Sequence, residues 1–144
     1  MRLALATLAL LLTGPAHAWQ AGQEGAICTL SHSEAGVDVR LTHDPAVPLY
    51  TITVTGPAAW PEAPSFSIAF LGGEEIIIST DRHELSGDGR ALGVADRGFG
   101  NVLAGLSRNT RAEFIAGPAT LSVSLDGAAP EVAAFEACGV APVA

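Results

Sequence analysis

The stretch ICTLSHSEAGVDVRLTH, residues 27–43, decides the fold class. Apolar and polar residues alternate on both sides of the turn-forming segment SEAG, which is typical of two antiparallel strands with one buried face. A turn centred on that segment places Leu30 opposite Val39 and Cys28 opposite Leu41. The sequence therefore predicts a β-hairpin whose apolar side chains point into the core.

The same alternation continues through the middle of the chain. LYTITVTG, residues 49–56, and SFSIAF, residues 65–70, each place aromatic or branched side chains on one face. A glycine pair at residues 72–73 then predicts a turn into EEIIIST, residues 74–80. Because three isoleucines follow one another there, we expect that strand to be covered on both faces.

Two proline-containing segments interrupt the strands and predict loops. Proline is excluded from central strands, so residues 44–48 should form an exposed connection. Residues 56–64 form a second irregular connection, and we expect Trp60 to fold back from it as a lid on the core. The polar stretch that follows predicts two short strands, HEL and RALGVAD, around the turn SGDG.

The C-terminal third predicts two helices around one more hairpin. VLAGLSRN reads as a short helix, and RAEFIAG and ATLSVSL as a hairpin across residues 117–118. The last helix should be capped by Asp126, carry Pro130 in its first turn and end at Gly139. We therefore predict a mainly β fold, an antiparallel β-sandwich or open barrel of about eight short strands with one or two short C-terminal helices.

The first 18 residues, MRLALATLALLLTGPAHA, have the layout of a secretory signal peptide. Their apolar run is shorter than the about 20 residues needed to span a bilayer, so a retained anchor is the less favoured alternative. The residue directly after the predicted cut is Trp19 and not a cysteine, which argues against a lipid-anchored product. Cleavage after Ala18 leaves residues 19–144 as a single β-rich domain, periplasmic or secreted, with no membrane span.

The charge of the chain argues against several functions. All seven basic residues are arginines, and the loss of Arg2 with the signal peptide leaves six against fifteen carboxylates. An acidic surface repels phosphate backbones, so nucleic-acid binding is not expected, and an electrostatically steered partner would be cationic. No lysine is present to serve a phosphate-binding loop, which argues against an ATP-driven motor.

Cys28 and Cys138 are the only cysteines, one near each end of the mature chain. In an exported protein two cysteines usually pair, because the compartment oxidises thiols. We therefore predict a disulfide that ties the first strand to the last helix. A free thiol and a metal ligand are the alternatives, although two sulfurs alone make a poor zinc site.

The candidates for chemistry are few. His32, His43 and His83 remain after cleavage, but no HExxH helix or close histidine pair exists, so no metal ligand is predicted. No GxSxG nucleophile elbow is present either. A hydrolase using His83 with Asp81 or Asp96 stays open as an alternative. The sequence predicts no cofactor.

The stretch from Asp81 to Asn101 carries the densest set of polar residues. Its aspartates could supply paired carboxylates as in a glycosidase, but the favoured interpretation is solvated turns. Arg82 and Arg97 each follow an aspartate, which indicates local ion pairs, whereas the alternative is a patch that a partner approaches. That candidate interaction face comprises Asp81, Arg82, His83, Asp96, Arg97 and Phe99.

Three segments carry a resemblance to known sequences: YTITVT, STDRHELSGDGRALGVADRGFGNVLAGL and LSVSLDGAAPEVAAFEACG. Through them the mature chain resembles short exported alphaproteobacterial proteins of unknown function, some of which carry the label of the helicase-like component of excinuclease ABC. That label implies a long ATPase of DNA repair, from which this chain departs in length, charge, export signal and nucleotide motifs. The C-terminal part is also similar to the invasion-associated locus B family, which implies a periplasmic β-rich fold and no catalytic residues.

These observations favour a non-enzymatic module that binds another protein or an envelope component through the candidate interaction face. One alternative is a small periplasmic hydrolase built on His83. The other is an inhibitor of an extracellular hydrolase, which would present the loop AWPEAP to its target.

Overall fold

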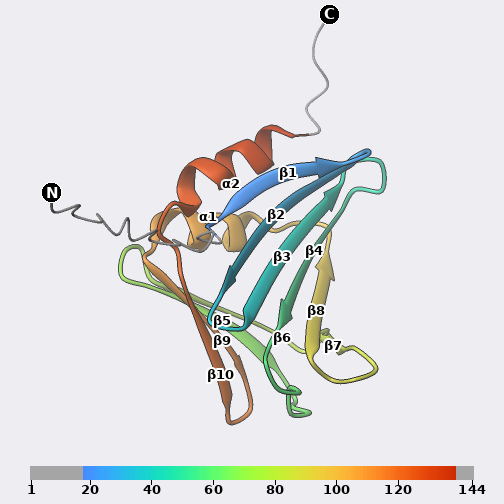
Figure 1. Ribbon diagram of the computed structural model, residues 1–144, viewed down its shortest axis with the longest axis vertical. Coiled ribbons are helices and arrows are strands. Elements are labelled where there is room, and N and C mark those ends of the chain that lie inside the picture. The colour runs from blue at the N-terminus through green and yellow to red at the C-terminus, as the bar shows by residue number, and fades with distance from the viewer. Residues whose placement is uncertain (1–17, 139–144) are drawn as a thin grey trace, which may run out of the picture.

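The computed structural model describes residues 18–138, which form two antiparallel β-sheets packed face to face, with two helices at one end (Figure 1). The predicted mainly β class is confirmed, as a sandwich rather than a closed barrel. The predicted signal peptide up to residue 17 and the predicted helix end at Gly139 lie outside the described residues. Within residues 18–138 no helix combines the length and apolar character needed to cross a bilayer.

The larger sheet has the strand order β1-β2-β3-β4-β8-β7 and the smaller sheet the order β10-β9-β5-β6. Every neighbouring pair is antiparallel. The larger sheet contains β1 (Gln20–Glu24), β2 (Ile27–Glu34), β3 (Val37–Asp44), β4 (Leu49–Thr55), β7 (Glu84–Leu85) and β8 (Ala91–Asp96). The smaller sheet contains β5 (Phe66–Leu71), β6 (Ile76–Thr80), β9 (Arg111–Ala116) and β10 (Ala119–Ser124), and the helices are α1 (Gly100–Arg108) and α2 (Ala128–Ala137).

The hairpin β2–β3 forms as expected, but its predicted register is wrong by two residues. Leu30 lies opposite Leu41, and the turn is the two-residue step Ala35-Gly36. Both turn residues have positive φ, 49° and 80°, which is the geometry that joins antiparallel strands most tightly. Sequence reasoning did not place the turn there because alanine rarely adopts that conformation. A shift by an even number of residues leaves each side chain on its predicted face, so the predicted core residues of the hairpin are still correct.

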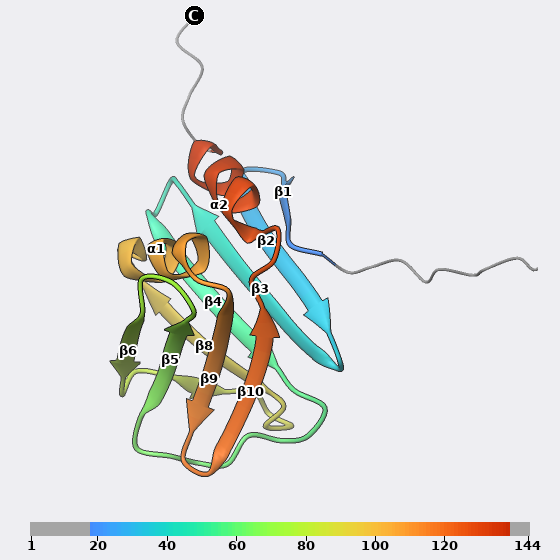
Figure 2. The same cartoon turned by 90° about the vertical axis from the view of Figure 1, so that its left-hand side faces the viewer.

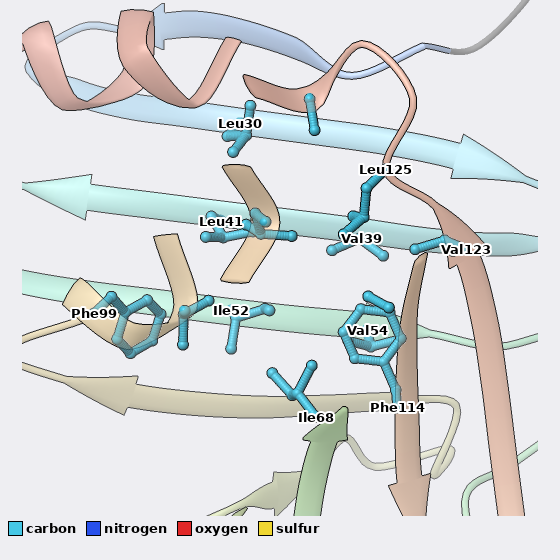
Figure 3. Close-up of a cluster of buried hydrophobic side chains, with 14 of the residues drawn as sticks. Leu30, Val39, Leu41, Ile52, Val54, Ile68, Phe99, Phe114, Val123 and Leu125 are labelled. Atoms are coloured by element: carbon cyan, nitrogen blue, oxygen red, sulfur yellow. The ribbon is translucent and has the colours of Figure 1, made fainter. Parts of the chain in front are cut away.

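The core lies between the inner faces of the two sheets (Figure 3). Ile68 and Phe114 of the smaller sheet point towards Ile52 and Val54 of the larger one. All four are under 5% exposed, and each such side chain contributes about 1.5–3 kcal/mol by leaving water. The alternation read from the sequence therefore identifies the inward faces of both sheets.

Strand β6 corrects one prediction. The run of three isoleucines was expected to be covered on both faces, yet β6 is the edge strand of the smaller sheet (Figure 2). Ile77 is 68% exposed and Ile76 37% exposed, while Ile78 is the one of the three that packs against the core. Apolar periodicity reports hydrophobicity and cannot distinguish an edge strand from a central one.

The disulfide Cys28–Cys138 is confirmed, with the two Cα atoms 5.9 Å apart. It joins the end of α2 to β2, which is the second strand. The prediction named the first strand because it did not include the short polar strand β1. Helix α2 starts after Gly127, whose φ is 75°, and no side chain caps it. The predicted capping role of Asp126 is therefore wrong.

The N-terminal end of the domain is held against α2 and β10. Trp19 is 3% exposed, and its indole Nε1 donates to the Ser124 carbonyl at 2.8 Å. Its ring stacks on His32 with centroids 4.7 Å apart. The backbone amide of Ala21 donates to Glu131 Oε2 at 2.9 Å. These contacts explain why a strand as polar as β1 is fixed in place.

The two predicted loops behave differently. Residues 44–48 carry the exposed Val47, which is 56% accessible. Trp60, in the second loop, is buried and donates from Nε1 to the Val54 carbonyl at 3.0 Å, with its ring edge-on to Phe66. The predicted lid is confirmed, and the connection between β4 and β5 that carries it crosses the end of the sandwich away from the helices (Figure 2).

Candidate functional site

A cleft of about 420 Å³ opens between the edge strand β6 and strand β8, where the two sheets are not joined. We call it the inter-sheet cleft. Its walls come from both sheets and from the start of α1. Its apolar lining residues are Ile52, Phe66, Ile68, Ile78, Val94, Phe99 and Val102. Because the lining side chains belong to the inward faces of the strands, the cleft is an extension of the core that reaches the surface.

An ion pair stands at the polar rim of the cleft. Arg82, which follows β6, donates from Nη2 to Oδ2 of Asp96, the last residue of β8, at 2.7 Å. The backbone amide of Arg97 donates to Oδ1 of the same carboxylate at 2.7 Å. These two donors, the Arg97 amide first and the Arg82 guanidinium after it, hold the pKa of Asp96 below its usual range. The pair thus links the ends of two strands from different sheets.

Another part of the lining comes from residues 98–102, at the start of α1. Phe99 is 4% exposed, lines the cleft and accepts the first helical hydrogen bond from Leu103. Gly98 and Gly100 flank it, and a Cβ added at either would meet no atom within 4 Å. The exposed Asn101 adds an amide to the rim. A ligand can therefore approach the backbone on both sides of a buried aromatic ring.

The residues proposed for hydrolysis are not assembled. His83 Nε2 bonds to the Ala63 carbonyl at 3.1 Å, and the ring packs near Phe66. Neither Asp81 nor Asp96 hydrogen-bonds to it within the described part of the chain. The imidazole therefore anchors the loop that carries Trp60.

The other titratable residues considered as catalytic or metal-binding candidates do not come together either. Asp88 accepts from the Ser86 hydroxyl and the Arg90 amide in its turn, and these bonds lower its pKa. His32 bonds to Glu34, and His43 stacks on a tyrosine of the next strand. Across residues 18–138 no group of three or more His, Cys, Asp or Glu side chains could hold a metal ion.

The candidate interaction face predicted from the sequence divides in three. Arg82, Asp96 and Phe99 meet at the inter-sheet cleft. Asp81 and Arg97 are exposed beside it, and His83 turns away to its loop. The predicted local pairing is replaced by a cross-sheet pair, Arg82 with Asp96.

Sequence reasoning missed the apolar lining of the cleft. Ile78 and Val94, the two half-buried residues of that lining, have the same alternation as fully buried neighbours, so no local signal marks them as reaching the surface. The isoleucines of β6 would have indicated this opening only if that strand had been recognised as an edge strand.

Comparison with known proteins gives no relative: no protein-family model, no curated protein and no solved structure matches this chain. The function must therefore be argued from the geometry of the cleft.

Proposed function

We propose that this chain is an exported, disulfide-bonded binding module of the cell envelope that holds its ligand in the inter-sheet cleft. The observation that carries the proposal is the cleft itself. Its seven apolar lining residues are accompanied by five polar ones, and an apolar hollow that carries such polar groups is typical of ligand sites. Five of the seven apolar lining side chains are buried, and Ile78 and Val94 are the two that stay half-buried, so these two offer the apolar contact surface for an occupant.

The disulfide supports the exported location, because such bonds persist in oxidising compartments. The N-terminal segment supports it as well, since residues 1–18 have the composition of a signal peptide. The ligand is another protein or an envelope component. The described part of the chain assembles no nucleophile, base or metal set around the cleft, and this favours binding over hydrolysis.

The loop proposed for an inhibitor is less favoured as the contact surface. Trp60 is buried and the Ala63 carbonyl is bonded to His83, so the exposed residues of the loop are Ala59, Glu62 and Pro64. A rigid inhibitory loop normally projects its anchor residue outward. Here the largest side chain of the loop points inward.

Capture from envelope fractions tests the proposal. Immobilised mature protein would be compared with Val94→Trp, which fills the cleft, and with the double variant Arg82→Ala/Arg97→Ala, which strips its rim. A charge-matched control, Arg40→Ala/Arg111→Ala, removes two arginines outside the cleft. We expect the control to retain the ligands of the wild type and both cleft variants to lose them. Identical ligands on all four proteins would refute the assignment.

A further inference from the structure

The outer edge of β6 has no strand partner. Within residues 18–138 the strand pairs with β5 alone, and none of the turn and loop backbone bonds involves residues 76–80. Natural edge strands are usually protected by a charge, a proline or a bulge, because open N–H and C=O groups template further pairing. The strand IIIST has no charge or proline, and it exposes Ile77.

We propose that an extended peptide segment of a partner pairs with this free edge of β6 and inserts apolar side chains into the inter-sheet cleft. The proposal rests on the proposed function and names the chemical class of the ligand. Strand addition of this kind takes its affinity from backbone hydrogen bonds and its specificity from alternate side chains.

The register of β6 decides which side chains would enter. Ile78 lies opposite Ile68 and Thr80 opposite Phe66, so these residues share the inward face of the sheet. Both Ile78 and Thr80 line the cleft. A strand added beside β6 would place every second side chain on the same face, above the cleft, and the intervening ones beside Ile77. The ligand should therefore alternate apolar and polar residues.

The charges at the two ends of β6 select the flanks of that ligand. Glu75 precedes the strand, Asp81 follows it, and both carboxylates are exposed and outside the ion pairs of the described residues. The nearby Arg82 and Arg108 are each already paired with a carboxylate, and the exposed Arg97 beside the cleft offsets one of the two remaining negative charges. The surplus is negative, so lysine or arginine should flank the bound segment. A second copy of this chain, with the same acidic ends, fits the edge poorly.

A synthetic peptide of alternating valine and threonine with lysines at both ends is the probe. Amide hydrogen exchange, followed by NMR on the intact mature protein, reports on β6. Saturating peptide should slow exchange of the open-edge amides about tenfold or more, because paired amides exchange only through opening. A control peptide with alternate backbone nitrogens methylated keeps the side chains and removes the pairing. A glutamate-flanked peptide should bind about fivefold more weakly, as exposed attractive pairs become repulsive.

Two matched variants locate the effect. Ile77→Lys places a charge on the edge strand at an exposed position, and we expect it to abolish the slowed exchange. Val47→Lys makes the same change at another exposed apolar residue, far from β6 in sequence, and should leave binding intact. Equal protection by the methylated peptide, or loss with both variants, overturns strand addition.

The outcomes also separate this inference from the proposed function. If Val94→Trp loses its envelope ligand while no peptide protects β6, the cleft binds something other than a strand. If the wild type forms a dimer without peptide, and Ile77→Lys is monomeric by sedimentation, the edge pairs with a second copy and the proposed peptide partner is wrong.

Discussion

Opening the Cys28–Cys138 bridge should remove a large part of the stability of this domain. The sulfurs are 110 residues apart in sequence, and closing a loop of that length lowers the entropy of the unfolded chain by about 16 cal/mol/K on the chain-entropy model. At 25 °C this corresponds to about 5 kcal/mol, as an upper value. Small domains are stable by about 5–15 kcal/mol, so the reduced protein should be close to unfolding.

Urea unfolding followed by tryptophan fluorescence measures the effect, because Trp19 and Trp60 are both buried. Oxidised and reduced wild type retain the same atoms in the core, so their difference isolates loop closure from packing. We expect the reduced protein to lose about 3–5 kcal/mol and to show a larger m-value, since an uncrosslinked unfolded chain exposes more surface. The variant Cys28→Ala/Cys138→Ala should match the reduced protein to within the packing lost at the buried Cys28, and reductant should not affect it. Equal stability and equal m-values with and without reductant would refute the reasoning.

Three further changes test separate features. Gly105→Ala should destabilise by about 1–3 kcal/mol or more, because its Cβ would lie 2.3 Å from the ring of Phe70, whereas Gly100→Ala has open space and serves as the control in thermal melts. Ala35→Asn should stabilise by about 0.5–1 kcal/mol in urea titrations, since asparagine tolerates the positive φ of 49° better than alanine; a loss of stability would contradict the turn geometry. The pKa of Asp96 in the folded protein lies below its ordinary value of 3.8, so the unfolded chain binds the proton more readily. The stability that this carboxylate contributes should therefore be complete above about pH 5 and should be lost as the pH falls through the lowered folded pKa. Asp96→Asn should therefore flatten the acid limb of the stability curve, and parallel curves for the two proteins would exclude the contribution.

Alternation predicted the central strands well because the inward face of each of them is buried. The faces of residues such as Leu30, Leu41 and Val54 were correct even though the hairpin register was not. Register depends on the turn, and here an alanine occupies a conformation that its side chain disfavours. A pattern of residue types carries no signal for that exception.

Features fixed by distant contacts were the ones that the sequence did not reveal. Strand β1 is polar and is held by Trp19 and by a bond from Ala21 to Glu131, whose sequence separation is 110. The edge position of β6 is set by the strand order of the sheet, in which β5 pairs with β9 on its other side, and not by the residues of β6.

For the same reason, the pairing of Arg82 with Asp96 replaced the predicted pairing of sequence neighbours. The charged residues of this site could be identified from the sequence, but which of them pair could be seen only in the folded structure.

The attachment of α2 to the opposite end of the chain has a consequence for biogenesis. Phe135 and Glu131 of α2 fill the core and hold β1, and Cys138, the residue that follows the helix, closes the bridge. A polypeptide that leaves a ribosome or a secretion channel amino end first cannot finish its architecture until that helix has emerged. Any chain that stops before α2 would keep an uncovered interior and an unpaired thiol, and proteases could remove it. Completion of this domain thus depends on synthesis through Cys138.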